Sequence, residues 1–190
     1  MLVRANDRSL PDASRTLGHC GECGQCEHCD ARSRSVCSVI EPANLGQLAL
    51  HSQRFEVPAG RTFIDEGELA RDFFVLTQGH AKLFTLMQDG RRQITGFADS
   101  GDFLGLASAE TYAFSAEALT PLRLCRFSHA GMRLLKSQFP LLDRRLFEEA
   151  SQELAHAQAR MLLLGRKTAR ERVASFLMER STLFNQVLED

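Results

Sequence analysis

The feature that most constrains this chain is a group of five cysteines within eighteen residues near the N-terminus. Cys20, Cys23, Cys26 and Cys29 follow one another with two residues between neighbours, and Cys37 comes after seven more. Thiolates are soft, charged donors that suit zinc and iron–sulfur clusters. Residues 20–37 offer little apolar surface for packing, so we expect a metal or cluster to order them.

The cysteine spacing does not decide which metal or cluster is bound. A ferredoxin run is C-x2-C-x2-C-x3-C-P, whereas the last spacing here is two residues and Asp30 stands in place of proline. The alternative is a zinc site, with His19 or His28 available as a fourth ligand. Cys125 lies in an apolar run, which by itself is typical of a small core residue. It becomes a ligand candidate if its strand runs beside the N-terminal segment.

The composition is that of an ordinary globular protein, with 44% hydrophobic and 25% charged residues. The net charge of −1 lacks the basic excess that a complete DNA-binding module usually has. The first residues contain no apolar core of a signal peptide, and no run of eighteen apolar residues occurs. We therefore expect a cytoplasmic protein, in which clustered thiols stay reduced and more often bind metal than form structural disulfides.

Short apolar runs separated by turn residues occupy residues 54–128. Their spacing of near ten residues, with glycine in the turns, predicts an antiparallel barrel or jelly roll. Asp89–Gly90, between two such runs, predicts a hairpin turn. A jelly-roll interior can hold a small ligand, but residues 102–117 contain no Arg or Lys to pair with a phosphate.

A helical pattern begins at Pro140. Its apolar positions step by three and four residues, which favours pairing with another helix, and a long helix cannot bury its whole length on a compact β-domain. Gly165 is expected to end or loosen this helix. Thr168 and Glu171 match a capping box at the start of a second helix. The predicted dimer interface contains Leu146, Ala150, Leu154, Ala157, Met161 and Leu164.

Three stretches carry a family resemblance. Residues 89–97 and 101–105 read DGRRQITGF and GDFLG, residues 161–169 read MLLLGRKTA, and Cys26 to Cys37 form a C-x2-C-x7-C motif. They are similar to a strand pair, to the end of the dimer helix and to the cluster motif of one family. The chain therefore resembles the CRP/FNR superfamily of transcription regulators, and within it the FNR/FixK/FnrN branch.

The resemblance implies metal ligands. The family's fourth ligand lies on a late barrel strand, and Cys125 falls at that place. Cys20 and Cys23 are alternates, which would replace a ligand or stay idle. The implied cofactor is a 4Fe–4S cluster held by Cys26, Cys29, Cys37 and Cys125, and no other cofactor-binding residues are implied.

The resemblance also implies an α+β fold. We expect an antiparallel β-roll or jelly roll of the cyclic-nucleotide-binding type, followed by a long dimerisation helix and the start of a winged-helix domain. The expected parts are a mobile arm at 1–19, a Cys-rich cluster-binding segment at 20–40, a β-roll sensor domain at 41–135, a dimerisation helix at 139–165 and the start of a truncated helix-turn-helix domain at 166–190.

The implied function is the sensor and dimerisation part of an oxygen- or redox-responsive DNA-binding regulator, not an enzyme. A homodimer is expected, with promoter DNA and RNA polymerase as partners of a full-length form; without a recognition helix this chain is not expected to bind a specific operator alone. Nucleotide-binding relatives carry an Arg near Tyr112 to Ser115, which this chain lacks. Ala157 replaces an acidic residue of the dimer helix, so the dimer is expected to form without that repulsion. The alternative is a zinc-stabilised or ligand-sensing regulator of the same fold without an oxygen-labile cluster.

Overall fold

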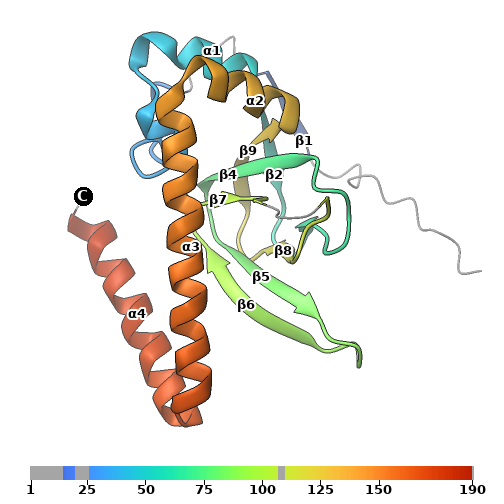
Figure 1. Ribbon diagram of the computed structural model, residues 1–190, viewed down its shortest axis with the longest axis vertical. Helices are drawn as coiled ribbons and strands as arrows, with labels where there is room; N and C mark the ends of the chain where they lie inside the picture. The colour runs from blue at the N-terminus through green and yellow to red at the C-terminus, as the bar shows by residue number, and fades with distance from the viewer. Residues whose placement is uncertain (1–14, 20–25, 107–109, 190) are drawn as a thin grey trace, which may run out of the picture. The chain divides into compact units, whose positions relative to one another are not determined.

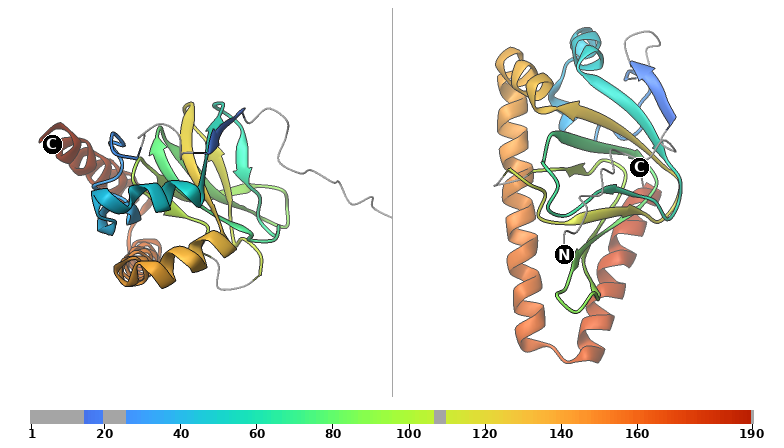
Figure 2. Two further views of the ribbon diagram at one scale, coloured as in Figure 1. Left: turned by 90° about the horizontal axis from the view of Figure 1, so that it is seen from above. Right: turned by 90° about the vertical axis from the view of Figure 1, so that its right-hand side faces the viewer.

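The computed structural model describes residues 15–19, 26–106 and 110–189 of the chain. The chain divides into two compact units, residues 1–147 and 148–190, and the boundary falls inside a long helix. Residues 1–14 of the expected arm lie outside the described part. Within that arm, Arg15–His19 forms strand β1, which pairs with β2 at the edge of a sheet (Figure 2).

The first unit is a β-roll with short helices before and after it (Figure 1). It starts with β1, the 3-10 helices η2 (Val36–Val39) and η3 (Pro42–Asn44), and α1 (Leu45–Leu50). The strands that follow are β2 (Ser52–Val57), β3 (Thr62–Ile64), β4 (Asp72–Gln78), β5 (Ala81–Leu86), β6 (Arg92–Ala98), β7 (Phe103–Leu104), β8 (Ser115–Ala118) and β9 (Leu122–Ser128). Helix α2 (His129–Gln138) and the first turns of α3 (Pro140–Arg166) complete the unit.

Two antiparallel sheets make up the roll. The five-stranded sheet has the order β1-β2-β9-β4-β7, and the four-stranded sheet has the order β3-β8-β5-β6. Strand β9 pairs with both β2 and β4, so the last strand of the roll lies inside its sheet rather than at an edge. The predicted α+β architecture, an antiparallel roll followed by a long helix, is confirmed.

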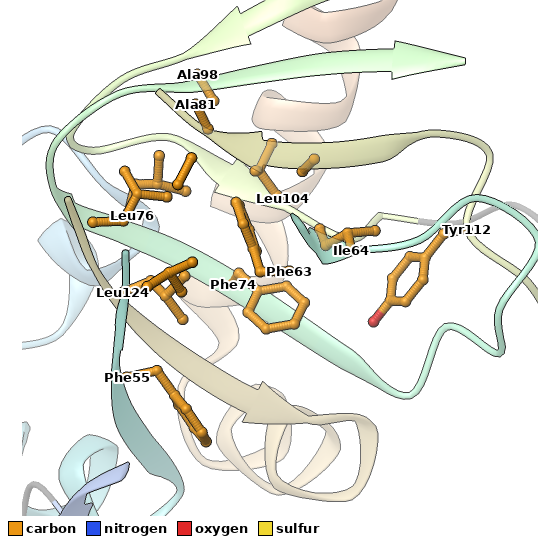
Figure 3. Packing of buried hydrophobic residues seen from close by; sticks show 14 of the residues in the cluster. Phe55, Phe63, Ile64, Phe74, Leu76, Ala81, Ala98, Leu104, Tyr112 and Leu124 are labelled. Carbon is orange, nitrogen blue, oxygen red and sulfur yellow. The ribbon is translucent and has the colours of Figure 1, made fainter. Parts of the chain in front are cut away.

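The five-stranded sheet buries side chains on both faces, because successive residues of a strand point in opposite directions. On β9, Leu122 and Leu124 belong to a cluster between the two sheets, here called the roll core, whereas Cys125 and Phe127 belong to a second cluster. Figure 3 shows the roll core, in which Phe63 and Phe74 meet edge to face at 5.8 Å between ring centroids. Each fully buried side chain of this size contributes about 1.5–3 kcal/mol of burial free energy.

The second cluster, here called the outer cluster, joins parts of the first unit that are distant in sequence. It receives side chains from the segment that carries the cysteines, from α1, from the sheet and from the helices that follow it. The cysteine segment, the sheet and the base of α3 therefore share one apolar interior. Its buried members are Val36, Ile40, Leu45, Leu48, Val75, Cys125, Phe127, Met132, Leu135, Leu142 and Leu146.

The hairpin predicted at Asp89–Gly90 joins β5 and β6. The Gly90 backbone N–H donates to the Met87 carbonyl at 2.9 Å, and the Met87 N–H donates to the Arg91 carbonyl at 2.8 Å. Gly90 has a φ of +82°, a left-handed conformation that glycine adopts without steric cost. The turn prediction is confirmed.

The second unit contains the rest of α3 and helix α4 (Ala169–Glu189). Gly165 lies inside α3, which continues to Arg166 rather than ending at the glycine. At the start of α4 the Thr168 N–H donates to Glu171 Oε2 at 2.8 Å, and the Glu171 N–H donates to Thr168 Oγ1 at 3.4 Å. This reciprocal pair is the predicted capping box. No helix in the described part of the chain is long and apolar enough to span a membrane.

Candidate metal centre

The described part of the cysteine segment is ordered by packing and by local hydrogen bonds. Ala31 and Val36 are buried, and Ile40 is 1% exposed in the outer cluster. The Ser35 hydroxyl accepts from the Cys37 N–H at 3.3 Å and so caps the short helix η2. Residues 20–37 were expected to offer too little apolar surface to be ordered by packing. A few well-placed apolar residues suffice for residues 26–40, because the sheet and helices supply the other side of the interface.

Three of the four predicted cysteine ligands belong to the outer cluster or pack against it. Cys125 on β9 is 7% exposed and belongs to the outer cluster, and Cys26 and Cys37 are half-buried against that cluster. Cys125 thus shares a cluster with the cysteine segment, while the strands that pair with β9 are β2 and β4. The side chain of Cys125 faces away from the roll core, because its neighbour Leu124 faces into it.

Cys29 is half-buried, and its carbonyl accepts from the Arg32 N–H at 3.0 Å. Its thiol is not among the side chains packed on the outer cluster. All four of these cysteines are free of disulfides. Cys20 and Cys23, the alternates, lie outside the described residues. His28, a candidate zinc ligand, is exposed.

Among the described residues, no three Cys, His, Asp or Glu side chains are close enough together to hold a single metal ion. A tetrahedral zinc site with Zn–S bonds of about 2.3 Å needs sulfurs about 4 Å apart. In a four-iron cluster each thiolate binds a different iron, so the sulfurs stand farther apart. Three cysteines from separate segments that pack on one apolar cluster fit the chemistry of such a group.

Near the position where nucleotide-binding relatives carry an Arg, the side chains of this chain form hydrogen bonds within the roll. The Tyr112 hydroxyl donates to the Asp72 carbonyl at 2.8 Å, and Ser115 Oγ accepts from the Glu66 N–H at 3.0 Å. Phe114 packs on the roll core. Burial raises the pKa of Tyr112, which keeps its hydroxyl protonated as a donor. The polar groups here serve the fold and supply no cation for a phosphate.

The residues of the predicted dimer interface fall into two groups, one buried and one exposed. Leu146 is 8% exposed because it packs in the outer cluster of its own chain, so the structure assigns it to the core rather than to an interface. Farther along α3, Leu154 is 60% exposed and Met161 is 69% exposed. Ala150 is also exposed and Ala157 is half-buried, whereas the side chain of Leu164 lies outside the described set.

Two arginines accompany the cysteines and were not predicted as site residues. Arg32 lies in the spacer between Cys29 and Cys37, and Arg54 stands directly opposite Cys125 in the pairing of β2 with β9. The position of Arg32 between two cysteines was a signal that the sequence contained. Arg54 had no such signal, because only the strand register brings it to Cys125.

Known proteins resemble this chain in sequence and in fold. The cyclic nucleotide-binding domain family matches residues 54–138. The nitrogen fixation regulation protein FixK of Bradyrhizobium diazoefficiens is 37% identical over 147 residues, which cover 77% of this chain and 62% of that protein. The transcriptional activator protein FnrL of Cereibacter sphaeroides is 36% identical over 146 residues, 77% of this chain and 59% of that protein. The chain thus spans about three fifths of the length of these relatives.

The solved structure of FixK2 from Bradyrhizobium japonicum matches with a TM-score of 0.63 and 34% identity, covering 67% of this chain and 65% of that one. The sensor domain of the regulator DNR from Pseudomonas aeruginosa shares the fold, with a TM-score of 0.59 and 21% identity over 70% of this chain and 91% of that one. These relatives are named as regulators and not as enzymes. The antiparallel roll, the long helix that follows it and these similarities show that the chain belongs to the CRP/FNR superfamily.

Proposed function

We propose that this chain is the sensor and dimerisation part of a cytoplasmic transcription regulator that responds to oxygen or to another redox signal. The proposed cofactor is a 4Fe–4S cluster bound by Cys26, Cys29, Cys37 and Cys125. Relatives named as a nitrogen fixation regulator and a transcriptional activator support the regulatory role. In a full-length form the proposed partners are promoter DNA and RNA polymerase.

The observation that supports the proposal is that Cys26, Cys37 and Cys125 all pack in or against the outer cluster. Nearly ninety residues separate Cys37 from Cys125. A lone core cysteine would need no second thiol at the same wall, whereas a cluster needs thiolates to converge from separate segments. A half-buried apolar wall also limits solvent access, which influences how a cluster reacts.

Such a cluster supplies, when bound, iron–sulfur bonds that oxidants can attack. The packing of the chain's own residues decides how the loss of such a cluster would change the structure. Val36 and Ile40 insert into the outer cluster that also covers Leu142 and Leu146 at the base of α3. As long as the cysteines hold their segment against β9, these helix residues stay covered. Release of the segment would expose them and shift the population between two arrangements of the paired helices.

The exposed side chains Leu154 and Met161 support a homodimer through α3. They follow the three-and-four spacing of paired helices, and large apolar side chains on one helix stripe are stabilised when a second helix covers them. Ala157 lies between them on the same stripe and introduces no charge. We therefore expect the dimer to form in the absence of the cluster as well, with the cluster adjusting its geometry.

Anaerobic purification with iron, acid-labile sulfide and zinc analysis tests the proposal. We expect about four irons and four sulfides per chain and a broad visible absorption band that air bleaches. Cys125→Ser keeps the size of the side chain but removes the thiolate, and it should abolish the full cluster. One zinc per chain without sulfide, unchanged by air, would instead establish the zinc-stabilised alternative.

The double variant Cys20→Ser/Cys23→Ser is the matched control. It removes two thiols from the same region and leaves the pair Cys26 and Cys29 in place. The proposed ligand set predicts that this variant keeps its iron, its sulfide and its response to air. Loss of the cluster there, with retention in Cys125→Ser, would show that the ligand set is a different one.

A further inference from the structure

We infer that Arg32 and Arg54 are positioning residues that balance the charge of the thiolates and hold the cysteine segment in its binding shape. The inference rests on the proposed function in one respect, that these cysteines bind metal as thiolates. It applies to a 4Fe–4S cluster, and also to zinc once the thiolates are drawn together around that ion, because several thiolates around either group leave net negative charge at a half-buried site. Such charge is costly unless cations or hydrogen bonds compensate for it.

Arg32 closes a ring of hydrogen bonds that encloses the spacer between Cys29 and Cys37. Its Nη2 donates to the Ile40 carbonyl at 2.8 Å, and the Ile40 N–H donates to the Cys37 carbonyl at 3.1 Å. The Cys37 N–H donates to Ser35 Oγ at 3.3 Å, and that hydroxyl donates to the Arg32 carbonyl at 3.2 Å. The backbone around Cys37 is therefore fixed by the side chains of Arg32 and Ser35.

The same ring is tied to Cys29, because the Arg32 N–H donates to the Cys29 carbonyl at 3.0 Å. Ser35 is 1% exposed, so this part of the ring is shielded from water. The two cysteines that flank the spacer are thus held in one rigid turn of the chain. A metal that binds both would meet a backbone that needs little further ordering.

The Arg32 guanidinium also has an unused donor. Its Nε is buried and has no hydrogen-bond partner among the described residues. None of the ion pairs found in the described part of the chain joins Arg32 to a carboxylate. A buried donor of this kind is normally paired, and a thiolate or cluster sulfide would be a suitable acceptor for it.

Arg54 places a second cation on the other segment that supplies a cysteine. It pairs directly with Cys125 in the antiparallel register of β2 and β9. Directly opposed side chains lie on the same face of a sheet with Cβ atoms about 4.5–5.5 Å apart. Arg54 is half-buried. One half-buried arginine therefore lies within the cysteine segment, and one lies on the strand that pairs with the strand of Cys125.

The test compares charge removal with charge retention in the whole chain. We expect Arg32→Gln and Arg54→Gln to weaken zinc binding by the metal-free protein about 10–100-fold, the usual effect of losing a group that supports metal ligands. Arg32→Lys and Arg54→Lys keep the charge and should recover part of the loss. The readouts are zinc affinity against a chromophoric chelator and the iron and sulfide content after anaerobic reconstitution.

Arg34→Gln is the matched control, since Arg34 lies in the same turn with the same charge but is exposed. It should bind zinc and iron within about twofold of the unsubstituted chain, because a single exposed charge has a small effect. Ser35→Ala breaks the ring without changing any charge, and it should speed hydrogen exchange at the Cys37 amide.

Equal affinity in the Gln variants and the unsubstituted chain would overturn the inference, as would equal losses in the Gln and Lys variants. If Arg32→Gln does not fold, Arg32→Lys and the Arg54 pair still decide the question. Failure of the proposed function is a separate result: in that case the unsubstituted chain itself binds neither zinc nor an iron–sulfur cluster.

Discussion

Gly79 shows at the scale of a single residue how closely the backbone of the roll approaches itself. Its φ is +90°, and a Cβ built there would lie 2.5 Å from the Pro121 carbonyl oxygen. Such a contact with backbone cannot be relieved by turning a side chain. The position therefore requires glycine for its conformation and for its space.

We predict that Gly79→Ala destabilises the chain by roughly 3 kcal/mol or more, since backbone strain and steric overlap add. Gly90→Ala is the matched control, because Gly90 has a φ of +82° but open space around it. It should cost only about 1–2 kcal/mol. Urea unfolding of both variants measures the difference, and equal costs would mean that the contact with Pro121 relaxes easily.

Glu117 forms ion pairs with two basic side chains on the four-stranded sheet. Its carboxylate contacts Lys82 Nζ at 2.7 Å and Arg92 Nη1 at 2.8 Å, and its side chain is 13% exposed. The hydrogen bond from Lys82, followed by the charges of Lys82 and Arg92, holds the pKa of Glu117 below its usual value. The folded state thus favours the ionised form.

We predict that Glu117→Gln costs about 1–3 kcal/mol at neutral pH, the usual range for losing charged hydrogen bonds. A lowered folded pKa gives stability that is present above the unfolded value of about 4.3 and is lost as the pH falls through the folded pKa. The difference from the unsubstituted chain should therefore shrink in acid, as urea unfolding at several pH values would show. Asp89→Asn, which removes an exposed pair with Arg91, should change stability by less than about 1 kcal/mol.

At the scale of an element, strand β9 serves two interiors at once. Leu124 faces the roll core while Cys125 and Phe127 face the outer cluster. Both Leu124 and its neighbour Cys125 are apolar, and Arg126 follows them, so simple alternation did not reveal which face Cys125 occupies. The face is decided by the pairing of β9 with β2 and β4.

The start of α4 is the second feature at this scale, and its capping box leads to a prediction. Thr168→Ala should destabilise the first turn of α4 by about 0.5–2 kcal/mol, because the Glu171 N–H loses its acceptor. Hydrogen exchange at the first amides of α4 should become faster by a corresponding factor. Gln158→Ala, in the interior of α3 and exposed, should leave those amides unchanged. An unchanged rate in Thr168→Ala would mean that contacts other than the cap begin this helix.

At the scale of the whole molecule, the exposed stripe of α3 leads to a prediction about assembly. Leu154→Glu should raise the dimer dissociation constant by roughly tenfold or more, since a charge in an apolar helix seam is desolvated without a partner. Sedimentation under anaerobic conditions measures this constant. Gln152→Glu adds the same charge about 160° around the helix and should leave the dimer intact. If both variants dimerise like the unsubstituted chain, α3 is not the interface.

Local patterns in the sequence determined much of this protein. The Asp89–Gly90 turn and the Thr168–Glu171 capping box depend on residues a few positions apart, and both formed as predicted. The alternation of apolar runs and glycine turns likewise indicated an antiparallel roll. Such features are governed by backbone conformation and side-chain periodicity, which neighbouring residues carry by themselves.

Only the tertiary structure decided how distant parts meet. Leu146 continues the periodicity of the dimer stripe, yet it is buried in its own chain because α3 begins against the outer cluster. The packing of Cys125, Cys26 and Cys37 on one cluster follows from contacts across many residues of sequence, and the place of Arg54 opposite Cys125 follows from strand register. Periodicity tells which side of an element is apolar, but the partner that covers it is selected by the packing of the whole chain.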